Sequence, residues 1–316
     1  MGAEEEAGYL EKRLKIALSI AALGIVALLA GIFLSMQMGG EWRVSEDGIL
    51  EYPIPEPEYS LIPFEEQGGS NSNLSEVILS EVGFSSRGAE MAGLLRVPPA
   101  RPSGGFPGVV LLPGATVTKE QEQGLAKFLS GLGYASLALD QRNLGGVDIR
   151  SDLEMFLAGR EPTEHKMVHD ALAAAEVLRT QPGIDPDRIV YLGESNGGRF
   201  AIIASALDQR SRGVIAISTC GYDVKAEEID LLRKSGPDAV RFLRSIDPDT
   251  YLARIPPRRL VMIHSLNDTV IPFELAERTY QKALEPKDMH IVGCATHGRC
   301  GEMDPYIEEE LAGMME

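Results

Sequence analysis

The alternation of short apolar runs with helical patterns, which begins near residue 77, most constrains how this chain can fold. Continuous apolar runs such as residues 109–112 and the segment YASLALD suit strands that are buried on both faces of a sheet. Stretches such as HKMVHDALAAAEVLRTQ instead place apolar residues at helical spacing. Strands that alternate with helices are joined by right-handed crossovers, so the sequence predicts an α/β fold with a mostly parallel central sheet and helices on both faces. Functional residues are then expected at the carboxyl ends of the strands.

One of these strand ends carries the sequence G-E-S-N-G, residues 193–197, between the predicted strand RIVYL and the predicted helix GGRFAIIASAL. G-x-S-x-G in this strand–turn–helix context is typical of a serine nucleophile. The serine of such a turn has a strained backbone conformation, so the positions two before and two after it must be small. We therefore predict that Ser195 is a nucleophile, held at a helix N-terminus where the dipole favours developing negative charge.

Two later strand ends offer an acid and a base. Asp268 follows the predicted strand RLVMI and is able to orient a histidine and stabilise its cation, and Asp223 is the alternative acid. His297 is the predicted base that activates the serine, because it lies in a late loop and is followed by glycine. His264 and His290 fall at the end of one predicted strand and within another, which makes them weaker candidates.

The oxyanion of an acyl-transfer intermediate needs backbone donors close to Ser195. The amide of Asn196, directly after the nucleophile, is the first expected donor. The second is expected from residues 113–116, the loop after the strand VVLL, with the amide of Ala115 preferred to that of Thr116. Each such donor typically contributes about 3 kcal/mol to stabilisation of the transition state.

Two pairs of residues have the spacing of weak metal sites. His165 and His169 are four residues apart on a predicted helix, but no third ligand is evident, so a partly exposed helix face is expected. Cys294 and Cys300 flank His297, and again no second pair supplies further ligands. Three cysteines are too few for a disulfide scaffold, so we expect free thiols, with a local disulfide as the alternative. No metal and no organic cofactor is predicted.

Over roughly residues 77–316 the sequence resembles the α/β-hydrolase superfamily, which shares the chain order of serine, acid and histidine. The segments that carry the resemblance are LLPGA, GYASLALDQRNLGG, GESNGG, HSLNDTVIP and ATHG. They are similar to the branch of dienelactone-hydrolase-like proteins, acyl-peptide-hydrolase-like peptidases and carboxylesterases. The resemblance implies the α/β-hydrolase fold and acyl transfer to water. Dienelactone hydrolases proper carry cysteine where this chain has Ser195, which argues against that activity.

The resemblance and the three candidate residues together predict a serine hydrolase that cleaves carboxylic esters of a small-molecule or acyl substrate. Peptide or amide hydrolysis is the second interpretation, and a non-catalytic binding module of the same fold is the third. A helical insertion at residues 226–252 is expected to form a small cap that either lines an acyl pocket or packs on the body. The net charge of −17 argues against nucleic acid as a partner, because phosphate binding needs clustered Lys and Arg.

Residues 16–40 contain no charged side chain. An apolar helix of about 20 residues spans a bilayer core of about 30 Å and satisfies its own backbone groups, so residues 16–38 are predicted to cross the lipid bilayer. A cleaved signal peptide is the alternative, but its apolar region is usually shorter. Lys12, Arg13 and Lys15 precede the run, which places the N-terminus in the cytoplasm and the catalytic domain outside it.

These patterns divide the chain into three parts. Residues 1–40 are predicted to be a cytoplasmic stub with the membrane anchor, and Trp42 to lie at the bilayer interface. Residues 41–76 are rich in Pro, Gly, Ser and acidic residues, so an irregular and partly mobile linker is expected there. Residues 77–316 are predicted to form the α/β-hydrolase domain.

Overall fold

The computed structural model describes residues 42–64, 77–99, 102–222 and 236–316. Three predicted features therefore lie wholly or partly outside the described residues: the membrane span at 16–38, the end of the linker at 65–76, and the start of the cap at 226–235. Asp223, the alternative acid, lies outside them as well. Among the residues that are described, no helix has the length and apolar character needed to cross a membrane.

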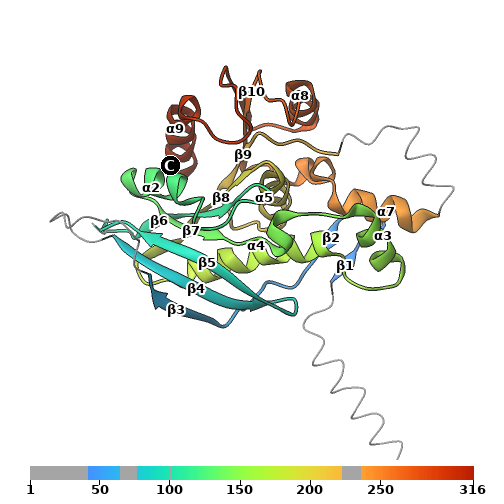
Figure 1. Cartoon of the computed structure of the whole chain (residues 1–316), viewed down its shortest axis with the longest axis horizontal. Coiled ribbons are helices and arrows are strands. Elements are labelled where there is room, and N and C mark those ends of the chain that lie inside the picture. Colours follow the sequence, from blue (N-terminus) through green and yellow to red (C-terminus); the bar gives the residue numbers. More distant parts are fainter. Residues whose placement is uncertain (1–41, 65–76, 100–101, 223–235) are drawn as a thin grey trace, which may run out of the picture. The chain divides into compact units, whose positions relative to one another are not determined.

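A nine-stranded sheet forms the centre of the described part of the chain (Figure 1). Its order is β11-β10-β9-β8-β6-β7-β5-β4-β3. The six strands from β6 to β11 pair in parallel, and β3, β4 and β5 pair antiparallel at one edge, so the predicted mostly parallel sheet is confirmed. The strands are β3 (Tyr59–Pro63), β4 (Ile78–Ser86), β5 (Ala89–Val97), β6 (Phe106–Leu112), β7 (Ala135–Leu139), β8 (Ile184–Glu194), β9 (Gly213–Ile217), β10 (Arg259–Ser265) and β11 (Lys287–Val292).

Helices cover both faces of this sheet, because successive side chains of the central strands point to opposite sides. On β6, Val110 belongs to the core on one face and Val109 to the core on the other. The first face is covered by α4 (Thr163–Arg179), α5 (Asn196–Leu207) and α8 (Phe273–Lys282). The second is covered by α2 (Gln123–Gly131) and α9 (Asp304–Met315). This two-sided arrangement confirms the α/β-hydrolase fold expected from the sequence.

The segment before the main domain is only partly an irregular linker where the structure describes it. It contains the two-stranded sheet of β1 (Arg43–Val44) and β2 (Leu50–Glu51), and then β3. The Leu50 side chain is fully buried, and its amide donates to the Tyr251 hydroxyl at 3.0 Å. The expectation of an irregular linker is therefore wrong for β1, β2 and β3, whereas residues 52–58 between them have no regular structure, as expected. Ile49 and Leu50 are buried on the main domain, which composition alone does not reveal.

Trp42 packs on the protein. Its ring centroid lies 5.5 Å from that of His165 and 5.9 Å from that of Phe156. Phe156 belongs to α3 (Ile149–Leu157), a helix that was not predicted from the sequence. The half-buried Trp42 ring therefore has aromatic neighbours within the domain, and its place at a bilayer interface stays a prediction.

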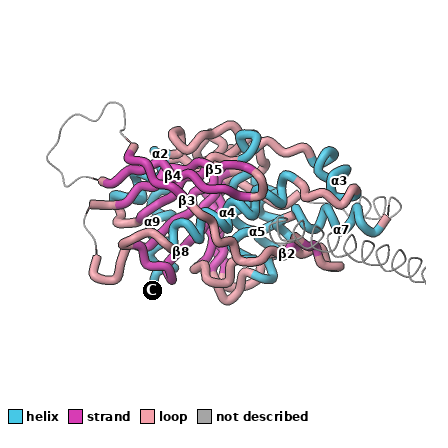
Figure 2. Tube along the Cα trace, turned by 90° about the horizontal axis from the view of Figure 1, so that it is seen from below, coloured by secondary structure: helices cyan, strands magenta, loops and turns pink. Residues whose placement is uncertain are grey.

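The described part of the predicted cap, residues 236–252, packs near α3 and β1 (Figure 2). It consists of α7 (Pro237–Ile246) and two short 3-10 turns, η2 (Pro248–Thr250) and η3 (Leu252–Arg254). Phe242 of α7 is fully buried, with its ring centroid 5.6 Å from that of Phe156 on α3. The apolar residues of the insertion were expected either to line an acyl pocket or to pack on the body. For Phe242, the structure supports packing on the body.

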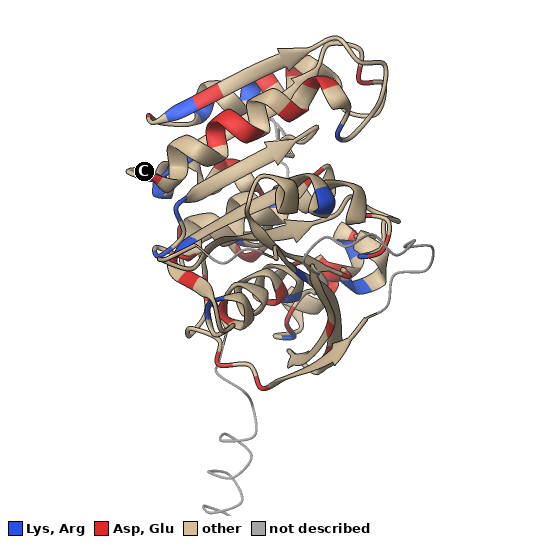
Figure 3. Cartoon of the chain, turned by 90° about the vertical axis from the view of Figure 1, so that its left-hand side faces the viewer, with Lys and Arg blue, Asp and Glu red and all other residues tan. Residues whose placement is uncertain are grey.

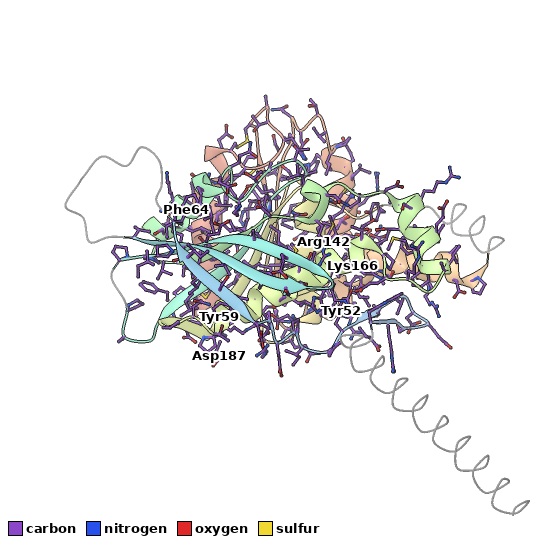
Figure 4. The ribbon with its side chains drawn as sticks, turned by 60° about the horizontal axis from the view of Figure 1, so that its bottom comes forward. Tyr52, Tyr59, Phe64, Arg142, Lys166 and Asp187 are labelled. Carbon is purple, nitrogen blue, oxygen red and sulfur yellow. A yellow bond between two sulfur atoms is a disulfide. The ribbon has the colours of Figure 1, made fainter. Side chains whose placement is uncertain are left out.

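The β4–β5 hairpin, predicted with a turn at residues 86–88, ends beside the N-terminal segment and α4 (Figure 4). Arg87 and Gly88 at its tip have φ values of 42° and 75°, which a tight turn requires. The Arg87 guanidinium pairs with Glu161 at 2.7 Å and lies 5.5 Å from the centre of the Tyr52 ring. Tyr52 in turn donates to Glu161 at 2.5 Å. The hairpin tip therefore helps to hold residues 42–52 on the domain.

Lys and Arg residues and Asp and Glu residues are interspersed along the chain in the view of Figure 3. Some of them form ion pairs, such as Arg188 with Asp185 at 2.6 Å and Arg259 with Asp288 at 2.5 Å. Partly exposed pairs of this kind contribute at most about 1 kcal/mol each. The stability of the fold must therefore come mainly from its two apolar cores.

Because Leu50 is fully buried, its replacement should show how firmly the N-terminal segment is attached. We expect Leu50→Ala to lower the free energy of unfolding by about 2–5 kcal/mol, through lost burial and the cavity that remains. Urea denaturation of the chain from residue 42 measures this. Leu61→Ala is the matched control, since Leu61 in β3 is 42% exposed and its truncation should cost less than about 0.5 kcal/mol. Equal losses in the two variants would contradict the packing described for Leu50.

Candidate active site

The three residues expected to act together lie beyond the carboxyl ends of neighbouring parallel strands. Ser195 follows β8, Asp268 follows β10 and His297 follows β11. The His297 Nε2 atom lies 2.7 Å from the Ser195 Oγ atom, and its Nδ1 atom lies 2.8 Å from Asp268 Oδ2. The structure thus brings together residues that are 102 and 29 positions apart in the chain.

The turn that carries Ser195 is strained and tightly packed. Ser195 has φ 52° and ψ −118°, a conformation that L-residues rarely adopt. A Cβ atom at Gly193 would overlap the backbone of Gly197, and one at Gly197 would overlap the carbonyls of Leu112 and Pro113. Only glycine fits at these two positions, so β8 is able to run directly into α5 and expose the serine.

Hydrogen bonds on both sides hold the backbone of this turn. The Ser195 amide donates to the Ile217 carbonyl at 2.8 Å, and the Thr219 hydroxyl donates to the Ser195 carbonyl at 2.6 Å. Both partners belong to β9 or to the residues directly after it. Hydrogen bonds to the next strand of the sheet therefore hold the strained backbone of Ser195. Such strain persists only where the surrounding structure imposes it.

Asp268 is arranged to stay ionised and to face His297. Its side chain is fully buried, and Oδ1 accepts hydrogen bonds from the amides of Val270 at 2.8 Å and Ile271 at 3.0 Å. Burial raises the pKa of Asp268, but the hydrogen bonds from His297 and from these two amides outweigh it and hold the pKa below its ordinary value. The remaining oxygen, Oδ2, is left to accept from His297 Nδ1, which fixes the orientation of the imidazole.

The two expected oxyanion donors belong to the residue directly after Ser195 and to the loop after β6. Asn196 is the first residue of α5, where an amide has no acceptor within its own helix. Gly114 packs against the serine, since a Cβ atom there would lie 3.4 Å from Ser195 Cβ. Within the described residues, no acceptor is found for the Ala115 amide, whereas the Thr116 amide donates to the Leu144 carbonyl at 2.6 Å. Thr116, the second choice from the sequence, is therefore excluded as a donor because its amide is already bonded.

The segment DQRNLGG, residues 140–146, is a structural loop that braces the loop of Ala115. The Gln141 side-chain amide donates to the Pro113 carbonyl, and the Asn196 side-chain amide donates to the Gly145 carbonyl at 2.6 Å. Gly145 has φ 73°, and a Cβ atom there would come within 3.0 Å of Ala115 Cα. The short helix η1 (Arg142–Gly145) thus packs directly on the loop that carries Ala115.

Arg142 ties this brace to the domain (Figure 4). Its guanidinium forms two hydrogen bonds to the Asp170 carboxylate of α4, at 2.6 and 2.9 Å. Asn143 and Leu144, which follow it, have φ values of 50° each. Two consecutive non-glycine residues with positive φ therefore mark this turn in the structure. In the sequence RNLGG, only the two glycines indicate a turn.

The other histidines lie in structural positions. His165 is fully buried and bonded to the Ser245 hydroxyl at 2.7 Å, and burial lowers its pKa to about 3. The partly exposed helix face predicted for His165 is therefore wrong, because α3 and α7 cover it. His169 bonds the Ser86 hydroxyl at 2.8 Å, and His290 bonds Glu310 at 2.7 Å. His264 bonds the Ile271 carbonyl at 2.9 Å beside the acid.

Cys294 and Cys300 form a disulfide, with sulfur atoms 1.98 Å apart and Cα atoms 6.7 Å apart. The expectation of free thiols is wrong for this pair, and the alternative of a local disulfide holds. The loop after β11 folds back on itself and brings the two residues within reach, which spacing alone does not show. His297 lies inside the closed loop. Cys220 is a free and buried thiol.

Comparisons with known proteins agree with this fold. Curated relatives include the uncharacterized protein YfhR of Escherichia coli O157:H7, which is 29% identical over 139 residues, or 43% of this chain and 47% of YfhR. The matches cover between 31% and 66% of the length of these curated relatives. Among solved structures, acetyl xylan esterase from Paenibacillus sp. R4 aligns with a TM-score of 0.62 and 18% identity, over 83% of this chain and 89% of that one.

A second structural neighbour is the glucuronoyl esterase from Solibacter usitatus, with a TM-score of 0.60 and 15% identity over 88% of this chain and 90% of that one. These low identities support the α/β-hydrolase fold. The decisive comparison is with a family model described as acetyl xylan esterase (AXE1), which matches residues 67–255 and so more than half of the chain. The chain therefore belongs to the acetyl xylan esterase (AXE1) family of hydrolases.

Proposed function

We propose that this chain is a serine hydrolase that cleaves carboxylic esters, with Ser195 as nucleophile, His297 as base and Asp268 as the acid that orients it. The observation that carries the proposal is the position of His297, within hydrogen-bond distance of both Ser195 Oγ and Asp268 Oδ2. The family match includes Ser195 and both proposed oxyanion donors, whereas Asp268 and His297 lie beyond its end at residue 255. The acid and the base therefore rest on geometry and chain order.

The proposed reaction is acyl transfer in two steps. Ser195 Oγ attacks the ester carbonyl while His297 Nε2 accepts its proton, and the amides of Asn196 and Ala115 donate to the oxyanion. Collapse of the tetrahedral intermediate breaks the ester bond, and His297 returns the proton to the leaving alcohol. Water then attacks the acyl-enzyme with His297 again as base, which releases the carboxylic acid and restores Ser195. Asp268 stabilises the imidazolium that forms in each step.

Acetyl esters of hydroxyl-rich molecules are the substrate class that we propose first. The family description names acetyl xylan esterase, and two structural neighbours carry that name or the name glucuronoyl esterase in their titles. An ester is also easier to cleave than a peptide bond, because its carbonyl is less resonance-stabilised and an alkoxide leaves more readily than an amine nitrogen that has not been protonated. A panel of p-nitrophenyl acyl esters and acetylated sugars, run against peptide anilides, distinguishes the two classes of substrate.

Replacement of the nucleophile tests the proposal directly. We expect Ser195→Ala to lose labelling by a fluorophosphonate probe and to lower ester turnover by at least about 10⁴-fold, because the acyl-enzyme is no longer able to form. Ser60→Ala, at an exposed serine in β3, should react like the unchanged protein. Asp268→Asn should lower kcat by on the order of 10⁴-fold with the fold intact. Failure of the folded, unchanged protein to label would contradict the proposal.

The location of the protein remains a proposal from the sequence. We propose that residues 16–38 hold the chain in a bilayer, with the N-terminus in the cytoplasm and the catalytic domain on the other side. Carbonate extraction of membranes should leave the full chain in the pellet, whereas a chain that starts at residue 41 should appear in the supernatant. Added protease should digest the catalytic domain only from the extracytoplasmic side. A full chain that extracts like the shortened one would contradict the anchor.

The disulfide should influence the proposed reaction, because it closes the loop that carries His297. We expect reduction, or the double replacement Cys294→Ser with Cys300→Ser, to lower kcat by about ten- to a hundred-fold, since small displacements of a catalytic group cost rate. Thiol titration confirms the state of the pair during the assay. Cys220→Ser is the control for the free buried thiol. A fully reduced protein with unchanged kcat would show that the bridge does not position His297.

A further inference from the structure

Two acidic side chains, those of Glu194 and Glu122, lie next to each other close to the nucleophile. Glu194 precedes Ser195 at the end of β8, and Glu122 lies immediately before α2. Glu122 is only 6% exposed, and its carboxyl group interacts directly with that of Glu194. Two carboxyl groups are able to hydrogen-bond each other only when one of them carries a proton, since ionised carboxylates only accept. The pair is therefore able to share one proton beside Ser195.

Glu194 also contacts the loop that carries His297. Its Oε2 atom accepts a hydrogen bond from the Arg299 amide at 2.8 Å, two residues after the histidine. Gly298 lies between them with φ 84°, and a Cβ atom there would come within 2.8 Å of the same oxygen. The Glu194 carboxylate is therefore able to approach the backbone after His297 because residue 298 is glycine. One side chain, adjacent in sequence to the nucleophile, fixes the backbone beside the base.

Burial, with the neighbouring Glu194, favours a neutral Glu122 at neutral pH. Burial raises the pKa of Glu122 to about 8, with a further contribution from the charge and hydrogen bond of Glu194, and Arg299 opposes the shift. The Arg299 guanidinium is itself bonded to Asp304 of α9 at 2.8 and 2.9 Å, which weakens its effect on the pair. Next to Glu122 in the chain, Lys119 pairs with Asp140 at 2.8 Å and with Glu120 at 2.8 Å. Arg96 of β5 faces the same segment and donates to Gln123 at 3.1 Å.

We propose that Glu194 is a positioning residue for His297, and that the proton it shares with Glu122 keeps it in place. Its kinetic consequence rests on the proposed function. When the proton is present, Glu122 donates to Glu194, and Glu194 accepts from the Arg299 amide. As the pH rises through about 8 the proton leaves, and two buried carboxylates then repel each other. Glu194 moves, the Arg299 amide loses its acceptor, and His297 is held less firmly at Ser195.

The first test compares the pH dependence of kcat in Glu122→Gln with that of the unchanged protein. The glutamine amide donates to Glu194 at every pH, so the variant should keep its kcat from pH 7 to pH 10, while the unchanged protein loses roughly ten-fold above about pH 8. KM should change little in either, because substrate contacts are not involved. Glu120→Gln is the matched control: it removes a carboxylate two residues away, with a side chain that is 48% exposed, and should keep the alkaline decline.

The second test needs no catalysis. Hydrogen exchange of the Arg299 amide should quicken by roughly ten-fold in Glu194→Ala at pH 7, because the variant removes its acceptor. Glu194→Gln keeps an acceptor oxygen and should restore most of the protection. In the unchanged protein the same amide should lose protection above about pH 8, beyond the intrinsic pH effect on exchange, and in Glu122→Gln it should not.

These measurements separate the inference from the proposed function. An alkaline decline in Glu122→Gln equal to that of the unchanged protein overturns the inference, and so does unchanged exchange of the Arg299 amide in Glu194→Ala. If the exchange results are as expected but the unchanged protein hydrolyses no ester, the contact between Glu194 and the His297 loop stands and the proposed function fails. Thermal unfolding of each variant at pH 7 checks that the fold is retained.

Discussion

The backbone packing at Gly193 and Gly197 is the constraint on which the candidate site depends. These two glycines lie against each other and against the carbonyls of Leu112 and Pro113, where no side chain has room. The same packing joins β8 to α5 without a connecting loop and brings the end of β6 alongside. Because β6, β8 and α5 meet there, the nucleophile, the helix N-terminus and the loop of Ala115 are positioned by a single contact. A larger residue at either glycine would displace all three.

Buried polar groups hold the loops around this contact. Gln141 and Asn196 use their side-chain amides to bind the carbonyls of Pro113 and Gly145, and each also has a buried oxygen without a hydrogen-bond partner in the part of the chain that the structure describes. Such arrangements cost stability, and they are typical of sites where loops must keep one conformation. The Asp268 carboxylate and the Glu194 carboxylate are used in the same way. The loops of the site are therefore held by hydrogen bonds to one another, although residues such as Ala115 and Leu144 remain exposed.

The sequence allowed the fold and the central residues to be predicted. Alternate apolar runs and helical stretches give the parallel sheet, because strand and helix periods are local properties. Ser195 could be placed since its turn needs glycines at fixed offsets. Asp268 and His297 followed from the rule that parallel strands end at one edge of the sheet, so that residues after β8, β10 and β11 meet. The prediction was weaker where no period or motif applies: α3 was missed, and residues 42–64 were assigned to a linker.

Local periodicity and motif spacing were enough to predict the order of most elements and the three candidate residues Ser195, Asp268 and His297. The groups that support these residues are defined only by the tertiary structure. The pairing of Cys294 with Cys300, the bond from Thr116 to Leu144, and the contact of Glu194 with Glu122 and Arg299 all depend on how close separate loops approach. That distance is set by the packing of the whole sheet and its helices, and no single stretch of sequence encodes it.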